Sequence, residues 1–158
     1  MLPQKQASPQ MPLNSGVLFS IRQWLALMTD AEMPMVLPFP SAPEETDYRI
    51  FPASLENDDR VFFHGTAEGN LASILSNGFR ISGELPSVSF ARNSSLSLGY
   101  ACQARGTLSP NGVVIAVRYE DLDKAFIIQE AFGLHVHCFS EPPKIIGYCV
   151  VPANYAHR

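Results

Sequence analysis

The sequence carries little charge, and the charge it has does not favour a polyanionic partner. Charged residues make up 16% of the 158 positions, and Asp and Glu outnumber Lys and Arg by 15 to 11. A surface that binds nucleic acid or an anionic membrane needs a local excess of Lys and Arg, and the few here are scattered along the chain. We therefore expect neither nucleic acid nor a membrane to be a partner.

Long apolar runs and paired cysteines are also absent from the sequence. A helix that crosses a membrane needs roughly 18 apolar residues or more, and the best candidate, residues 17–28, is broken by an Arg-Gln pair. The cysteines, Cys102, Cys138 and Cys149, are odd in number and irregularly spaced, which argues against a disulfide framework. We expect an intracellular protein, in the cytoplasm or the nucleus.

The sequence does contain enough apolar residues for a folded core. Hydrophobic residues make up 46% of the chain, which is typical of a globular domain. We divide the chain into an N-terminal leader over residues 1–59, a body over 60–152 and a C-terminal tail over 153–158. In the leader, apolar residues three and four apart predict a helix over 17–29, and dense prolines predict an extended linker over 33–43.

The body has few predicted helices and many predicted strands, which is typical of the α+β class. One helix is predicted over 67–77, with Thr66 as its N-cap and Gly78 as its stop. A second helix, capped by Asn93 or Ser94, is predicted to run to about Gln103. Apolar and β-branched runs predict strands over 48–51, 61–63, 88–90, 113–119, 126–129, 134–139 and 145–151.

A polar turn follows the first strand of the body. His64-Gly65-Thr66 comes directly after the apolar run 61–63. Because glycine has no side chain, a planar amide can reach its backbone N–H and C=O, and a ring nitrogen of His64 can bond a ribose hydroxyl. This composition predicts a small-molecule site at the end of the strand.

A second polar stretch, residues 89–100, offers groups that complement the first. On a helix, Ser97 and Tyr100 share one face. A hydroxyl and an aromatic ring on one face can bond an amide and stack on a flat heterocycle, so the two stretches together suit a nicotinamide riboside. The residues alone leave open the alternative that His64-Gly65-Thr66 is simply a strand followed by a capped core helix.

The two stretches resemble the two signature regions of the poly(ADP-ribose) polymerase-like ADP-ribosyltransferases. That family has a His-Gly-Ser/Thr at a strand end before a helix of the form Asn-x-x-x-Ile-Leu-x-x-Gly-Phe/Leu-Arg. Its second region reads Tyr-Phe-Ala, then Ser-x-Ser-x-x-Tyr. The matching residues here are His64-Gly65-Thr66, Asn70, Ile74-Leu75, Gly78-Phe79-Arg80, Ser89-Phe90-Ala91, Ser95, Ser97 and Tyr100.

The resemblance implies a split antiparallel β-sheet of the ADP-ribosyltransferase-like fold, with few helices and with NAD in the cleft between its halves. It implies that the backbone of Gly65 and the hydroxyl of Ser97 hold the nicotinamide carboxamide. It implies that Tyr100 stacks on the nicotinamide ring and that His64 bonds the adenosine-side ribose. The candidate cofactor-binding residues are His64, Gly65, Thr66, Ser89, Phe90, Ser97 and Tyr100.

Two departures from the family pattern concern the chemistry. Ser89 stands where the family has the tyrosine that forms the second stacking ring. The family's third signature is a Glu that opens a late strand. Strand order favours the region just before Pro142-Pro143, where the predicted strand carries His135 and His137 and no carboxylate, unless Glu130 takes that place. A carboxylate there steadies the oxocarbenium-like ribose as nicotinamide leaves. Glu130 and His64 are the candidate catalytic residues.

The resemblance implies a mono-ADP-ribosyltransferase that uses NAD as co-substrate, releases nicotinamide and modifies an unknown acceptor, which we expect to be a protein. Two alternatives stay open. One is an inactive module of the same fold that binds NAD, ADP-ribose or a protein, suggested by Ser89 and the missing Glu. The other is an RNA 2′-phosphotransferase, which the acidic balance disfavours.

Two further sets of residues have more than one interpretation. His135 and His137 alternate along a predicted strand and so share a sheet face, but Cys138 points to the other face. We therefore predict a pair of half-buried or site-lining histidines in preference to a metal site. Arg80 and Arg92 flank the proposed cleft and either contact the diphosphate of NAD or are ordinary surface charges.

Overall fold

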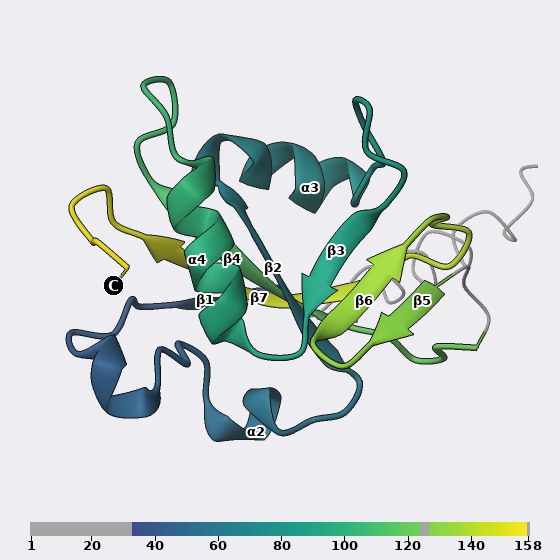
Figure 1. Cartoon of the computed structure of the whole chain (residues 1–158), viewed down its shortest axis with the longest axis horizontal. Helices are drawn as coiled ribbons and strands as arrows, with labels where there is room; N and C mark the ends of the chain where they lie inside the picture. Colours follow the sequence, from purple (N-terminus) through teal and green to yellow (C-terminus); the bar gives the residue numbers. More distant parts are fainter. Residues whose placement is uncertain (1–32, 124–126, 158) are drawn as a thin grey trace, which may run out of the picture. The chain divides into compact units, whose positions relative to one another are not determined.

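A seven-stranded sheet organises the part of the chain that the computed structural model describes, residues 33–123 and 127–157. The strand order is β1-β7-β4-β2-β3-β6-β5, with the β5–β6 hairpin at the right of Figure 1. The helix predicted over 17–29 lies outside the described residues. The strands are β1 (Met35–Leu37), β2 (Val61–Ala67), β3 (Val88–Ala91), β4 (Gly112–Arg118), β5 (Ile127–Glu130), β6 (Gly133–Val136) and β7 (Lys144–Val151).

The α+β class predicted from the sequence is confirmed, and the sheet is mixed. Every pairing from β2 to β7 is antiparallel, whereas β1 joins the edge of the sheet parallel to β7. Prolines flank β1 at positions 34 and 38, and proline lacks the N–H of a central ladder, so an edge position suits this extended segment. Residues 33–59 thus belong to the same compact unit as the body.

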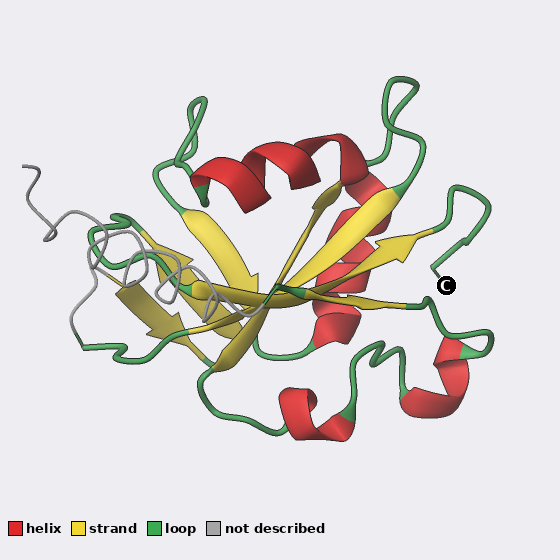
Figure 2. Ribbon diagram, turned by 180° about the vertical axis from the view of Figure 1, so that it is seen from behind, coloured by secondary structure: helices red, strands yellow, loops and turns green. Residues whose placement is uncertain are grey.

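Three short α-helices and two 3₁₀ turns complete the described fold (Figure 2). The α-helices are α2 (Ala53–Glu56), α3 (Leu71–Asn77) and α4 (Ser94–Ala104), and the 3₁₀ turns are η1 (Pro43–Thr46) and η2 (Glu68–Asn70). None of these helices has the length and apolarity that crossing a bilayer requires.

The prediction that Thr66 caps a helix is wrong. The pairing of β2 with β4 continues through Thr66 to Ala67, and α3 begins only at Leu71, after the turn η2. The Thr66 hydroxyl instead accepts a hydrogen bond from the Asn70 side chain at 2.9 Å. The predicted stop is confirmed, because α3 ends before Gly78, which has a φ of 74°. The pairing of β2 with β4 therefore outweighs the local preference of Thr66 for the N-cap position of a helix.

Two strand predictions also needed correction. No strand forms over 48–51, because Asp47 and Tyr48 have positive φ angles and the Tyr48 N–H bonds the Pro43 carbonyl within a turn. The strand predicted over 134–139 stops at Val136. The partner of Val136 in β3 is Val88, the first residue of that strand, so the ladder between β3 and β6 ends there.

The two faces of the sheet bury different cores. Side chains alternate along β2, so Phe63 packs with α4 residues such as Leu98 and Ala101, while Phe62 faces a second cluster that includes Phe79 and Phe90. In Figure 1, α4 lies in front of the strands, and in Figure 2 it lies behind them. The sheet is therefore covered on one face by α4 and on the other by the segment around α3.

Helix α4 is held firmly at its N-terminus. Of the two predicted capping residues, Asn93 is the N-cap, and its side chain accepts a hydrogen bond from the Leu96 N–H at 3.2 Å. The buried Ser94 hydroxyl accepts from the Ile50 N–H at 2.8 Å and donates to the Glu56 carboxylate, which also accepts from the Ser94 N–H. A carboxylate at this end complements the helix dipole.

The C-terminal end of α4 is held by one arginine. The Arg105 guanidinium donates to the carbonyls of Pro152 at 2.8 Å and of Tyr155 at 2.9 Å. The Tyr155 ring in turn packs on the core beneath α4. Both ends of α4 are thus anchored, which sets the position of the residues between them.

Candidate functional site

A cleft of about 1410 Å³ opens where β2 and β3 part. The two strands share a single register pair, Phe63 with Ala91, and diverge beyond it. The lining comes from β2, α3, β3, α4 and the β5–β6 hairpin. The residues named from the sequence as cofactor-binding or catalytic candidates all line it: His64, Gly65, Thr66, Ser89, Phe90, Ser97, Tyr100 and Glu130. Of the two histidines predicted beside them, His135 lines the cleft and His137 does not.

The backbone of Gly65 faces this cleft. The Arg60 carbonyl accepts from the Tyr119 N–H, and the Glu68 N–H donates to the Asn111 carbonyl, so the even-numbered residues of β2 bond to β4. Hydrogen-bonding direction alternates along an antiparallel strand, which turns the N–H and C=O of Gly65 away from β4. On that side β3 has already diverged, which leaves the amide within reach of a ligand.

The absence of a side chain at Gly65 serves the packing of α4. A Cβ added there would lie 1.9 Å from the Ser97 carbonyl oxygen and 2.8 Å from the Ala101 nitrogen. The sequence predicts that this glycine makes room for a ligand, whereas in the structure the free face of its Cα is filled by helix backbone. Glycine is required because α4 lies directly on β2, and that contact brings Ser97 to the cleft.

Ser97 and Tyr100 occupy different environments on α4. Ser97 is only 1% exposed, and its hydroxyl donates to the Phe63 carbonyl at 2.8 Å. Its oxygen can still accept a hydrogen bond, although its one proton is already used. Tyr100, nearly one turn later, is 52% exposed and lines the cleft. Its ring is therefore accessible from the cleft, and stacking on a flat ligand stays a prediction.

His64 is held as a neutral hydrogen-bond acceptor. Its Nδ1 lies 2.9 Å from the Ser89 carbonyl oxygen, and its ring packs edge-on against Phe79, with Phe90 also nearby. Burial lowers the pKa of His64 below its ordinary value of 6.5, against an opposing effect of the bond to Ser89. A carbonyl only accepts, so Nδ1 carries the proton and Nε2 keeps a lone pair. Nε2 can therefore accept a hydrogen bond from a hydroxyl such as that of a ribose.

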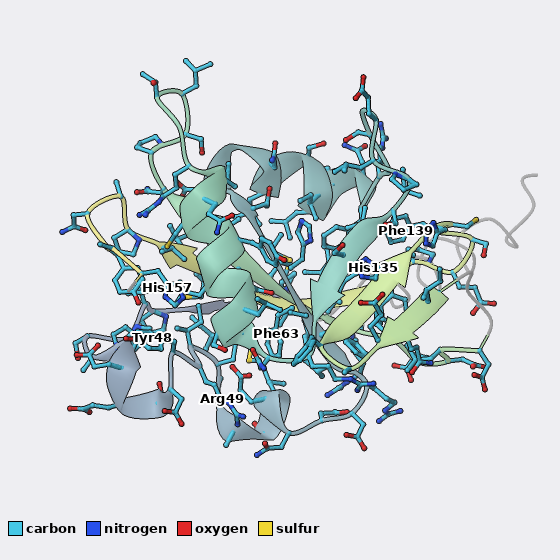
Figure 3. All side chains as sticks on the ribbon, viewed as in Figure 1. Tyr48, Arg49, Phe63, His135, Phe139 and His157 are labelled. Atoms are coloured by element: carbon cyan, nitrogen blue, oxygen red, sulfur yellow. The ribbon has the colours of Figure 1, made fainter. Side chains whose placement is uncertain are left out.

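A chain of three polar side chains crosses the β3–β6–β5 side of the cleft. The Ser89 hydroxyl lies 2.9 Å from Nδ1 of His135, and Nε2 of His135 lies 3.4 Å from a carboxylate oxygen of Glu130. Figure 3 shows His135 on β6, beside β3. Sequence reasoning placed these residues in one region but missed their contacts. The available signal was strand register, because Ser89 pairs with His135 across β3 and β6.

The two arginines that flank the cleft in sequence separate in space. Arg80 lines the cleft, whereas the Arg92 guanidinium lies over the Phe62 ring, 4.9 Å from its centroid, and approaches the Asp59 carbonyl at 3.5 Å. Arg80 alone of the pair is in place to meet an anionic ligand.

The described residues contain no group of three or more His, Cys, Asp or Glu side chains that could hold a metal ion. The arrangement instead offers an outward-facing amide, an exposed ring, a neutral histidine and a carboxylate around one cavity. Such a cavity can hold a flat amide-bearing ligand attached to a ribose.

Compared with models of known protein families and with curated protein sequences, the chain matches none.

Proposed function

We propose that this protein binds NAD in the cleft, releases nicotinamide and transfers a single ADP-ribosyl group to an acceptor. The observation that carries the proposal is the convergence of both signature stretches on one cavity. Residues separated in sequence, such as Gly65, Tyr100 and Glu130, all line it. The separation of β2 from β3 supports the split antiparallel arrangement of the ADP-ribosyltransferase-like fold, with β1 as an added parallel edge.

The proposed pose follows from the geometry of the β2–α4 side. The carboxamide of nicotinamide bonds the backbone of Gly65, whose N–H and C=O face the cleft. The nicotinamide ring stacks on Tyr100, and the amide N–H donates to the Ser97 oxygen. A ribose hydroxyl donates to Nε2 of His64. In each of the proposed hydrogen bonds, a donor on one molecule meets an acceptor on the other.

The opposite side supplies the charge that the reaction needs. Positive charge develops on the ribose as its bond to nicotinamide breaks, and a nearby carboxylate stabilises it. Glu130 brings a carboxylate to the cleft from the end of β5. Its side chain is 59% exposed, so the stabilisation is weaker than in a dry site and transfer is expected to be slow.

The test is incubation of the full chain with NAD labelled in its adenylate part, with nicotinamide release and transfer of label followed together. We expect both signals at high protein concentration and a large loss of both with Tyr100→Ala. Tyr100→Phe keeps the ring and is the matched control. Wild-type protein that neither releases nicotinamide nor becomes labelled would contradict the enzymatic proposal.

A second candidate is a module that binds NAD or ADP-ribose without transfer. Ser89, which cannot stack, and the exposure of Glu130 favour it. Calorimetric titration with NAD that shows binding while nicotinamide release stays at the background rate would select this function. RNA 2′-phosphotransfer has less support, because Arg80 is the one Lys or Arg among the described residues that line the cleft.

A further inference from the structure

Strand β5 forms an open edge of the sheet. It is the last strand in the order, and β6 is its one partner among the described residues (Figure 1). An edge strand presents backbone N–H and C=O groups to which another extended segment can add. Three of the four residues of β5 are exposed, and Ile127 is half-buried. The strand is therefore accessible from outside.

The hydrogen bonds of β6 show which backbone groups of β5 face this edge. The Arg92 N–H donates to the Phe132 carbonyl, so even-numbered residues at β6 bond towards β3 and odd-numbered residues bond towards β5. The odd-numbered residues of β6 pair with the even-numbered residues of β5. The N–H and C=O groups of Ile127 and Gln129 consequently point to the free edge.

The two edges of the sheet differ in their protection against strand addition. At the opposite edge, β1 is flanked by Pro34 and Pro38, which have no N–H to donate. Strand β5 contains neither proline nor lysine, and both residues commonly protect edge strands. Its two isoleucines favour an extended backbone. The edge beside the cleft is thus the one left open.

An added strand on β5 would reach the mouth of the cleft. Ile128 and Glu130 share a face of the sheet with His135, and both Glu130 and His135 line the cleft. A segment paired with β5 would place one side chain next to Ile128 and another, two residues away, next to Glu130. The second side chain would lie beside the carboxylate that the proposed transfer uses.

The side chains on this face select a segment by charge and polarity. Ile128 is 48% exposed and offers an apolar contact, whereas the side chain of Glu130 is 59% exposed and offers a carboxylate. The hairpin 127–136 contains no Lys or Arg to offset that charge. Because like charges on neighbouring strands repel, the position beside Glu130 favours a basic residue over an acidic one.

We propose that the free edge of β5 binds an extended, basic segment of the acceptor protein as a further strand of the sheet. That the bound protein is an acceptor rests on the proposed function, whereas the pairing itself needs no NAD. Backbone hydrogen bonds to Ile127 and Gln129 attach the segment, and side-chain contacts with Ile128 and Glu130 set its position along the edge.

The probe is the peptide acetyl-Thr-Val-Thr-Lys-Thr-Val-Thr-amide, titrated into the full chain and followed by NMR. Its residue order is the same in both directions, so it suits either strand orientation. We expect the amides of Ile127 and Gln129 to shift and to exchange more slowly. N-methylation of alternate peptide amides should abolish binding in one of the two alternating patterns only. Glutamate in place of the lysine should weaken binding about threefold, and Glu130→Gln should remove most of that difference.

Gln129→Pro removes one donor from the free edge, and proline is tolerated on an edge strand where the N–H faces solvent. We expect it to weaken peptide binding at least about fivefold, since a backbone hydrogen bond is lost. Gln129→Thr keeps the donor and is the matched control. Unchanged β6 amide signals in both variants show that the hairpin is intact.

Labelled NAD then tests the role of the bound segment as an acceptor. We expect more label on the binding peptide than on the N-methylated peptide that does not bind. Nicotinamide release without this preference overturns the acceptor role and leaves the proposed function in place. Peptide binding at β5 without any nicotinamide release contradicts the proposed function and supports the pairing alone.

Three results overturn the pairing itself. The first is no binding of the lysine peptide, and the second is equal binding by Gln129→Pro and the wild type. The third is self-association of the free chain that Gln129→Pro abolishes, measured by analytical ultracentrifugation, because the edge would then bind a second copy of this chain.

Discussion

The two sides of the cleft differ in how tightly the fold holds them. On the β2–α4 side, the helix backbone lies against Gly65, Ser97 is buried and both ends of α4 are anchored. On the β5–β6 side, Glu130 and Phe132 are exposed near the tip of a hairpin at the edge of the sheet. The proposed binding groups therefore lie on a rigid support, whereas the proposed reacting groups lie where side chains can move. This difference can be tested by changes placed on each side.

The largest difference in the free energy of unfolding is expected when one phenylalanine on each side of the cleft is replaced by alanine. Phe63→Ala removes a fully buried ring packed beneath α4 and should lower the free energy of unfolding by about 3–5 kcal/mol. Phe132→Ala removes a ring that is 75% exposed and should change it by less than about 0.5 kcal/mol. Urea unfolding measures both. Equal losses would mean that the two sides are equally well packed.

A smaller loss of stability is expected from Gly65→Ala. The added methyl group would overlap the Ser97 carbonyl, so β2 and α4 must separate, at a cost of about 3 kcal/mol. Gly106→Ala is the matched control, because no atom lies within 4 Å of a Cβ built there and its φ is not in the positive range. If Gly65→Ala unfolds at the wild-type urea concentration, the close contact between β2 and α4 is not as described.

Tyr100→Ala should affect binding more than stability, because the ring is half exposed. Loss of stacking is expected to weaken NAD binding by about 2 kcal/mol, by analogy with stacking of bases on aromatic side chains. Titration calorimetry measures the affinity, and Tyr100→Phe should bind like the wild type. An unchanged affinity in Tyr100→Ala would move the nicotinamide ring away from α4.

The smallest effect is expected from the protonation of His64. Its pKa in the folded protein is lowered by burial, so the unfolded chain binds the proton more readily. The contribution of His64 to stability is therefore complete above pH 6.5, the ordinary value, and is lost as the pH falls below it. NAD binding should decline at lower pH still, as the pH falls through the lowered pKa of the folded protein, because protonated Nε2 no longer accepts. Unfolding and NAD titration at pH 5.5 and pH 7.5, in wild type and in His64→Gln, check this; equal pH dependence in both proteins would contradict it.

Local sequence signals predicted the elements whose own residues decide their structure. The valine-rich run of β4, the apolar run of β7, the Asn93 cap and the Gly78 stop all follow from short-range preferences and are confirmed. Predictions failed where distant pairing outweighed such preferences, as at Thr66, which stays in the ladder to β4. They also failed over 48–51, where a turn uses the backbone N–H groups that a strand would need.

The sequence by itself determined which groups are available to the site: a His-Gly pair after a strand, and a serine and a tyrosine on one helical face. Only the tertiary structure decided that Gly65 is needed for the approach of α4 and that Ser89, His135 and Glu130 touch one another. The reason is the range of the interactions. Caps and turns form between neighbours in the chain, whereas strand register and helix-on-sheet packing join distant residues, such as Ser89 with His135 and Gly65 with Ser97, and depend on the whole core.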